Sequence, residues 1–203
     1  VRIDNGVNIE IYKPNSKNNN KIIFFQSGSI CDRKNQMTAI QMLAPFMKKY
    51  KNIKYKYAGG IIDQEYKELL DEYVIKNSLQ NQVEYIGEIK PGKELSKYYN
   101  EAKAFIFPST AEAFSLVILE AMASRTPVIS MDVGGISEVI VDNYSGFLVE
   151  EKNYAQFISK IIELKNDVTL RSKFSSNAFE IISNNFNIQK YCENVEKIYK
   201  NFI

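Results

Sequence analysis

The stretch "AFIFPSTAEAFSLVILEAMASRTPVIS", residues 104–130, contains a strand, a loop, a helix and a second strand in succession. Ala104–Phe107 is a short apolar run that ends at Pro108. Apolar residues then continue through a helical pattern from Ser115 to Ser124, and Pro127–Ser130 is a second short apolar run. Because a helix between two such strands returns the chain to the same edge, the strands should be parallel. The stretch therefore predicts one unit of a parallel sheet covered by helices.

The same alternation extends in both directions along the chain. Strands are predicted at Ile22–Phe25, Ile53–Tyr57, Val83–Ile86, Ala104–Phe107, Pro127–Ser130 and Gly146–Val149. Helices are predicted at about Gln36–Lys49, Gln64–Ser78, Lys93–Asn100, Ser115–Ser124, Ile136–Val141, Tyr154–Lys165, Asp167–Asn184 and Ile188–Phe202. This order predicts a Rossmann-like, doubly wound α/β domain with a parallel sheet of about six strands. It should occupy residues 1–203 as one unit, with an N-terminal segment 1–20 and closing helices 167–203.

The composition excludes several classes of function. The 203 residues carry a net charge of only +2, which argues against a nucleic-acid binder. The sequence contains no histidine, so a histidine base, a Ser-His triad and a histidine metal site are excluded within it. No run reaches the roughly 18 apolar residues of a membrane span. Cys31 and Cys192 lie far apart, which favours a reduced, intracellular setting. The expected location is the cytoplasm, with at most peripheral contact with the inner face of the cell membrane.

The loop after the first predicted strand, "SGSICDRKNQ", residues 27–36, indicates an anion site. Gly28 allows the backbone to turn, and Arg33 and Lys34 stand where the next helix begins. Two cations beside free helix N–H groups suit a phosphate or diphosphate. Taken alone, the loop is equally compatible with a solvated basic helix start. No Walker-type or Gly-x-Gly-x-x-Gly motif follows any strand, so ordinary P-loop and dinucleotide-binding functions lose support.

Two acids, Glu112 and Glu120, mark the loop and the helix of the opening stretch. Glu112 should lie in the loop, free to reach a ligand, whereas Glu120 lies just over one turn into a helix capped by Ser115. The N–H groups of Phe114, Ser115 and Leu116 should point between the acids, where the helix dipole favours negative charge. A nucleotide sugar, with hydroxyl groups at both ends and charge in the middle, fits this arrangement. The alternative for the two acids alone is an exposed surface position.

Several quoted motifs together resemble a known family. "EAFSLVILEAMASRTPVISMDVGGISEVI" resembles the Glu-x7-Glu region of retaining GT-B glycosyltransferases of family 4. In the expected order and spacing, "RIDNGVNIEIYKP" is similar to the segment that enters their second domain, "GSICDRKNQ" to the diphosphate loop, and "VEYIGEI" to the base-binding strand. "YYNEAKAFIFPS" and "DNYSGFLVE" also fall in register, so the resemblance covers nearly the whole chain.

The resemblance implies a role for each matching residue. Glu112 would contact the donor sugar near the reacting centre as the catalytic residue, and Glu120 would accept hydrogen bonds from the ribose hydroxyl groups. Lys34, with Arg33, would neutralise the diphosphate, and Ile89 would approach the base through its backbone. The remaining substrate-binding positions are Gly28, Ser29, Phe114, Ser115 and Leu116. The family implies a UDP-, GDP- or ADP-sugar donor, no metal and no other cofactor.

Three departures from the family pattern qualify these expectations. The usual Gly-Arg of the diphosphate loop is Gly28-Ser29, and Arg33 beside Lys34 is the candidate replacement for the arginine. The usual Gly-Phe-Gly is Ala113-Phe114-Ser115, whose backbone is less permissive. Gly59-Gly60 fits the family's glycine turn but is equally compatible with an ordinary turn.

The expected function is the C-terminal, donor-binding half of a bacterial retaining glycosyltransferase. A glycan or lipid-linked acceptor, in polysaccharide or capsule assembly, would bind through an N-terminal domain absent from this chain, which begins at Val1 rather than Met. The isolated chain would then bind donor but transfer little sugar. Two alternatives stay open: a non-catalytic nucleotide-sugar-binding module that works with a partner chain, and other GT-B chemistry such as a nucleotide-sugar epimerase or a phosphorylase.

Overall fold

The computed structural model describes residues 5–14 and 21–200. A parallel sheet of six strands lies between two layers of helices, in the strand order β3-β2-β1-β4-β5-β6. The strands are β1 (Ile22–Ser27), β2 (Ile53–Ala58), β3 (Val83–Tyr85), β4 (Ala104–Phe107), β5 (Val128–Met131) and β6 (Phe147–Val149). The order reverses between β1 and β4, which places the topological switch point, where such sheets bind ligands, at the carboxyl ends of those two strands.

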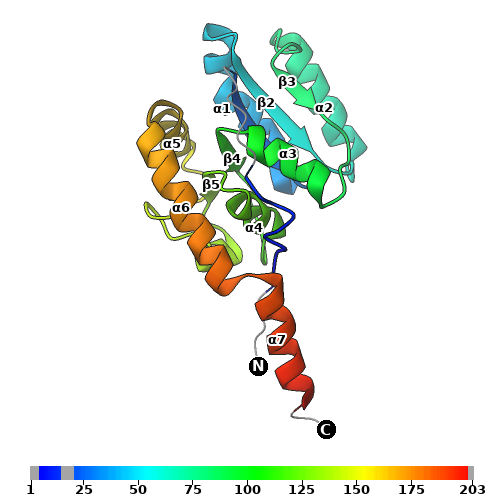
Figure 1. Ribbon diagram of the computed structural model, residues 1–203. Coiled ribbons are helices and arrows are strands. Elements are labelled where there is room, and N and C mark those ends of the chain that lie inside the picture. Colours follow the sequence, from blue (N-terminus) through cyan, green and yellow to red (C-terminus); the bar gives the residue numbers. More distant parts are fainter. Residues whose placement is uncertain (1–4, 15–20, 201–203) are drawn as a thin grey trace.

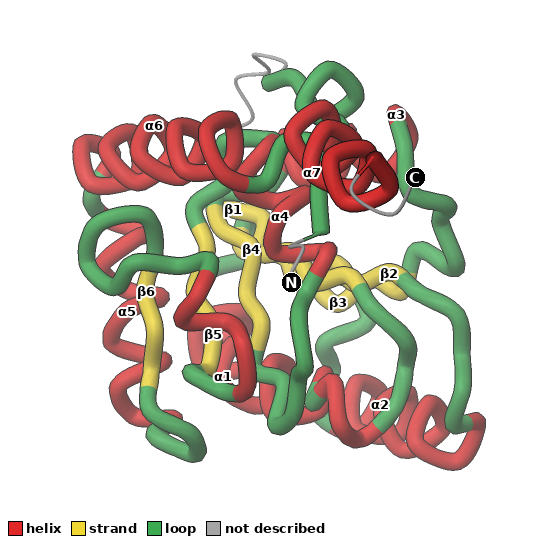
Figure 2. The backbone as a smooth tube through the Cα atoms, turned by 90° about the horizontal axis from the view of Figure 1, so that it is seen from below, coloured by secondary structure: helices red, strands yellow, loops and turns green. Residues whose placement is uncertain are grey.

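Seven α-helices accompany the sheet in the described residues. They are α1 (Gln36–Lys49), α2 (Gln64–Lys76), α3 (Lys93–Glu101), α4 (Leu116–Ala123), α5 (Tyr154–Asn166), α6 (Val168–Asn185) and α7 (Ile188–Lys200). Figure 2 shows α1, α2 and α5 on one face of the sheet, and α3, α4 and α6 on the other. In Figure 1, α7 extends away from the body of the molecule. None of its described residues is buried, so it adds little to the core.

The core follows from the apolar runs that predict the strands. All four residues of β4 and all four of β5 are buried, as expected for central strands covered on both faces. Tyrosine and phenylalanine rings fill the space around β1 and β4, where the Tyr99 ring meets Phe25 at 5.2 Å and Phe105 at 5.5 Å between centroids. Among the described helices, none is long and apolar enough to cross a membrane.

The structure confirms the predicted fold class and corrects one element. The six predicted strands are present, and β1 runs two residues further than predicted, to Ser27. The predicted helix Ile136–Val141 is instead a 3-10 segment, Gly134–Glu138. Gly134 enters it with a left-handed φ of 58°, and the β-branched run that follows leaves helical geometry for a turn. The predicted closing helix to Phe202, the N-terminal segment 1–20 and the outer limits of the domain extend beyond the described residues.

Candidate functional site

The loops after β1 and β2 lie directly against each other, beside the switch point between β1 and β4. Backbone N–H groups of Gly28 and Ile30 donate to the carbonyl oxygens of Ala58 and Gly60, at 3.0 and 2.9 Å. Gly59 has a φ of 148°, and a Cβ atom there would lie 1.9 Å from the Gly28 carbonyl oxygen. Only glycine fits such an approach, so Gly59 does more than form an ordinary turn. The predicted loop residues Gly28 and Ser29 are thereby held at the end of β1.

The loop after β4 is joined to the β1 loop by backbone and side-chain hydrogen bonds. Arg33 and Lys34 lie in a 3-10 turn, Asp32–Lys34, one residue before α1. The Arg33 carbonyl oxygen accepts from the Thr110 N–H group and the Ser109 hydroxyl, both at 3.0 Å. The Arg33 guanidinium donates to the Ala111 carbonyl oxygen at 2.9 Å. The two predicted anion-binding side chains therefore sit against the loop that carries Glu112.

Glu112 is enclosed by donors rather than free, which corrects the sequence prediction. Its Oε1 atom accepts from Lys34 Nζ at 2.5 Å and Ser109 Oγ at 2.6 Å, with an Arg33 nitrogen at 3.4 Å. The Glu112 and Lys34 side chains are only 6% and 11% exposed. An enclosed carboxylate is costly without partners, so in the unliganded chain it pairs with the cation beside it. Lys34 is thus committed to Glu112 until a ligand competes.

A second glycine pair fixes the backbone of the Glu112 loop from the side of β5. A Cβ atom on Gly134 would lie 1.5 Å from the Glu112 carbonyl oxygen, and one on Gly135 would lie 2.5 Å from that of Ala113. The 3-10 segment therefore packs backbone to backbone against this loop. Sequence reasoning did not assign Gly134 or Gly135 to the site, although a Gly-Gly pair directly after a buried strand was a visible signal.

The first turn of α4 presents polar groups to the same loop. Ser115 is the N-cap of α4, as predicted, but its side chain accepts no capping hydrogen bond. Its Oγ atom is buried without a hydrogen-bond partner in the described structure. The free N–H groups of the first helical turn begin at Leu116, whose side chain is exposed. An anion is the ordinary ligand of such a helix start.

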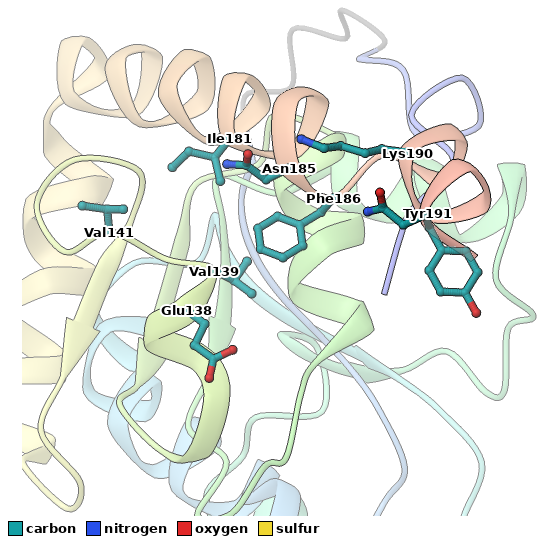
Figure 3. Close-up of a pocket in the computed structure, with 9 residues that line it drawn as sticks. Glu138, Val139, Val141, Ile181, Asn185, Phe186, Lys190 and Tyr191 are labelled. Carbon is teal, nitrogen blue, oxygen red and sulfur yellow. The ribbon is translucent and has the colours of Figure 1, made fainter. Parts of the chain in front are cut away.

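The Phe114 side chain packs against the closing helices, whereas the prediction for this residue concerned its backbone N–H group. Its ring lies 6.1 Å, centroid to centroid, from Phe186, the first of the two residues between α6 and α7. Phe186 also lines a cavity of about 410 Å³ at the α6–α7 junction (Figure 3). The other residues that line this cavity are Glu138, Val139, Val141, Ile181, Asn185, Lys190, Tyr191 and Asn194. The Phe114 side chain therefore connects the site loop with this junction, and only its backbone is available to the candidate site.

Glu120 is buried and held by two tyrosines. Tyr12 Oη donates to Oε1 at 2.7 Å, and Tyr99 Oη donates to Oε2 at 2.8 Å. Since the Tyr99 proton goes to the carboxylate, the Ser27 hydroxyl must donate to Tyr99 Oη, 2.6 Å away. Burial raises the pKa of Glu120 above its ordinary value, and the two tyrosine hydrogen bonds counter that rise. None of these partners was predicted from the sequence.

Glu120 forms part of the wall of a cavity of about 250 Å³ at the ends of β1, β2 and β3. Five of the predicted residues line it: Gly28, Ser29, Ile89, Leu116 and Glu120. The other lining residues are Ser27, Ala58, Gly59, Gly60, Glu88, Pro91, Leu95 and Val117. Arg33, Lys34, Glu112, Phe114 and Ser115 are not among the described residues that line this cavity. Near the start of α4 the structure thus has two separate features: an open pocket that includes Glu120, and the Lys34–Glu112 pair, which does not line that pocket.

The site holds no evident metal-binding cluster. Within residues 5–14 and 21–200, no three Asp, Glu or Cys side chains gather as metal ligands would. Positive charge at the site comes from Arg33, Lys34 and the start of α4. The arrangement can bind an anionic group beside α4 and hydroxyl groups at Glu120.

Comparison with known proteins assigns the family. The family model described as "Glycosyl transferases group 1" matches residues 7–181. A relative from Methanocaldococcus jannaschii, an uncharacterized glycosyltransferase, is 34% identical over 131 residues, which are 64% of this chain and 36% of that protein. The chain therefore spans about a third of that relative's length.

Two solved structures show the same fold. The C-terminal domain of a glycosyl transferase group 1 family protein from Francisella tularensis is 28% identical, with a TM-score of 0.81 over 90% of this chain and 100% of that domain. Anabaena HepE is 21% identical, with a TM-score of 0.87 for its complex with UDP-glucose and 0.88 for its complex with UDP and glucose. The UDP-glucose complex is matched over 98% of this chain and 57% of that one.

Proposed function

The chain belongs to the glycosyl transferases group 1 family, and we propose that it is the donor-binding part of a retaining, metal-independent glycosyltransferase of family 4. Its donor is a nucleoside-diphosphate sugar, and its acceptor is a glycan or a lipid-linked glycan. The observation that carries the proposal is the buried Glu120 carboxylate, fixed by two tyrosines at the wall of an open pocket. A fixed buried carboxylate suits a ligand with two adjacent hydroxyl groups, such as ribose.

The pocket can accommodate the nucleoside half of the donor. The ribose would place its hydroxyl groups at Glu120, and the base would extend toward Ile89 between the loops after β2 and β3. The UDP-glucose held by the Anabaena protein is a ligand of this class. The diphosphate would then follow the β1 loop to the start of α4, where Ser115 and the free N–H groups can receive its oxygen atoms.

The Lys34–Glu112 pair gives the second half of the mechanism. Diphosphate offers Lys34 a stronger negative partner, so donor binding would draw the ammonium group from Glu112 to the phosphate oxygens. Glu112, still held by Ser109, would then face the donor sugar. During transfer the bond from the anomeric carbon to the diphosphate oxygen would break while a bond to the acceptor hydroxyl oxygen forms, and the acceptor's proton would pass to the departing diphosphate. Lys34, Arg33 and α4 would stabilise the charge that the diphosphate gains.

A thermal-shift panel with UDP-, GDP- and ADP-sugars tests this proposal. A ligand present at about 100 times its dissociation constant stabilises a folded domain by about 2.7 kcal/mol, which gives a clear shift of the melting temperature. One nucleotide class should stabilise the chain, and Glu120→Gln should reduce that shift. The matched control is Glu163→Gln, which removes an acid from an exposed ion pair on α5. No shift with any of the three classes would contradict the proposed function.

A second candidate function, nucleotide-sugar binding without transfer, is favoured by α7. Its half-buried residues Ile188, Tyr191, Val195 and Ile198 recur at helical spacing, and none of the described residues of α7 is buried. This face suits contact with another lobe, in the same protein or in a partner chain. Sugar transfer by the protein that contains this chain, lost on Glu112→Gln, would distinguish an enzyme from a binding module.

A further inference from the structure

Of the two tyrosines that bind Glu120, Tyr12 precedes the first strand of the sheet. It lies in the N-terminal segment, 108 residues before Glu120, and its side chain is 3% exposed. Its ring packs edge-on against the Tyr99 ring at 6.0 Å between centroids. The hydroxyl group is therefore held in one place and aimed at a carboxylate that the donor site already uses.

The geometry leaves that carboxylate able to accept two further hydrogen bonds. Each carboxylate oxygen has two lone-pair positions, and each tyrosine occupies one position on a different oxygen. One acceptor position per oxygen is left, which matches the two hydroxyl groups of a ribose. Without Tyr12, Oε1 would lose its fixed donor and the carboxylate plane would be free to turn about the remaining bond to Tyr99.

Tyr12 also forms part of a second cavity on the same carboxylate. This cavity of about 190 Å³ is lined by Gly6, Val7, Asn8, Ile11, Tyr12, Pro91, Gly92, Leu116 and Glu120. Pro91, Leu116 and Glu120 line both it and the 250 Å³ pocket. The N-terminal segment thus borders the nucleotide site directly. The segment is itself anchored, because the Val7 N–H group donates to Phe186 O at 2.8 Å and Val7 O accepts from the Ile188 N–H group at 3.1 Å.

We propose that Tyr12 is a positioning residue for ribose recognition: its hydroxyl group fixes the Glu120 carboxylate in the orientation that accepts the ribose 2′- and 3′-hydroxyl groups. The proposal rests on the proposed function of Glu120. Under this proposal, the described part of the N-terminal segment, residues 5–14, contributes to nucleotide binding through Tyr12. Tyr99 alone, anchored through Ser27, fixes only one end of the carboxylate.

The test compares UDP, GDP and ADP with their 2′-deoxy forms by calorimetric titration of the 203-residue chain. Tyr12→Phe keeps the packed ring and removes only the hydroxyl group. Affinity for the ribonucleoside diphosphate that binds should fall about tenfold, the size of one hydrogen bond to a charged group. Affinity for its 2′-deoxy form should fall much less, so Tyr12→Phe should lose discrimination between the two sugars. A purely structural role of Tyr12 would weaken both ligands equally.

Two controls separate the possible outcomes. Tyr55→Phe removes another buried hydroxyl hydrogen bond, to Gln26 Oε1 at 2.7 Å, without contact to Glu120, and should keep the discrimination. In a Glu120→Gln background, Tyr12→Phe should cause no further loss, because its effect acts through that carboxylate. If Tyr12→Phe distinguishes the ribonucleoside diphosphate from its 2′-deoxy form as well as the parent does, the proposal for Tyr12 is overturned while the proposed function stands. If Glu120→Gln binds like the parent, or the parent binds no diphosphate, the proposed function fails as well.

Discussion

Lys34 connects the loop after β4 with strand β1, since its ammonium group contacts Glu112 while its carbonyl oxygen accepts from the Gln26 side chain of β1 at 2.7 Å. At the scale of single residues, the pair explains how an enclosed acid and an enclosed cation coexist without ligand. Breaking a largely buried pair leaves one charge without its partner, which is costly, whereas replacing both charges is far less so. Each charge therefore depends on the other in the unliganded fold, and these are the two groups that the donor would separate.

We predict that Lys34→Met alone lowers the free energy of unfolding by roughly 1–3 kcal/mol, the cost of leaving a buried polar group poorly satisfied. Adding Glu112→Gln should recover part of this loss, because the neutral amide still accepts from Ser109. Urea unfolding of the parent, both single variants and the double variant forms the cycle. Additive losses would show that the two side chains do not interact in solution.

Nucleotide binding should depend on the protonation of Glu120. The pKa of Glu120 is raised in the folded chain by burial, so acidification through that pKa neutralises the carboxylate. The neutral form accepts ribose hydroxyl groups more weakly, and affinity should fall. Folding responds with the opposite sign: a raised folded pKa means that this group stabilises the fold at low pH and loses that contribution as the pH rises through it.

The measurement is calorimetric affinity for the nucleoside diphosphate between about pH 7.5 and pH 5, a range in which a raised carboxyl pKa would register. The Glu120→Gln variant is the control, since its affinity changes with pH only through the ligand's own phosphate. The difference between the parent and variant curves of affinity against pH is then due to Glu120. The titratable groups that contact Glu120 in the described structure are Tyr12 and Tyr99, whose pKa values burial raises. Parallel curves for parent and variant would exclude a role for the carboxylate in binding.

At the scale of elements, the 3-10 segment after β5 supports the Glu112 loop through glycine contacts. Gly134→Ala should destabilise the fold more than Gly87→Ala. Both positions have a positive φ, 58° and 85°, so both variants carry backbone strain of about 1 kcal/mol. Only Gly134 would also drive its Cβ atom into the Glu112 carbonyl oxygen, whereas a Cβ atom on Gly87 meets nothing within 4 Å. The melting temperatures of the two variants measure the difference. Equal losses of stability would mean that the Glu112 loop moves away from the added Cβ atom at little cost.

Elements defined by local pattern were the part of the fold that the sequence could predict. β4 and β5 are short apolar runs with a Pro at one end, and each was located within one residue. The 3-10 segment was missed because Ile136, Val139 and Ile140 imitate helical spacing while Gly134 sets a different backbone. Whether an apolar triplet is helix or turn depends on its packing against residues distant in the sequence, which periodicity does not contain.

The candidate site, like the fold, has a part that local sequence pattern predicts and a part that depends on contacts between distant residues. Gly28, Ser29, Ile89, Leu116 and Glu120 were predicted and do line one pocket. The partners of the two acids were not predictable in this way. Tyr12 and Glu120 are 108 positions apart and meet only because the N-terminal segment crosses the end of α4. The enclosure of Glu112 likewise depends on Lys34, which is 78 positions away in the loop after β1, in addition to Ser109 of its own loop.

At the scale of the whole molecule, we propose that positive charge from side chains and from α4 takes the place of a metal ion. We therefore predict that EDTA leaves affinity for the nucleoside diphosphate unchanged within about twofold, and that added Mg²⁺ does not strengthen it beyond that range. Titration in EDTA, in Mg²⁺ and in Mn²⁺ measures this. A tenfold or greater loss in EDTA, restored by either metal, would show that the diphosphate needs a cation that these residues do not replace.

The central claim is that the Glu120 pocket binds the ribose of a nucleoside diphosphate. Its most direct test is calorimetric titration of the parent chain and of Glu120→Gln with UDP, GDP and ADP at neutral pH. We predict that one of the three binds the parent and that Glu120→Gln weakens its binding roughly 10- to 150-fold, as expected for losing a charge-assisted hydrogen bond of about 1.5–3 kcal/mol. Equal affinity of a normally folded Glu120→Gln and the parent would contradict it.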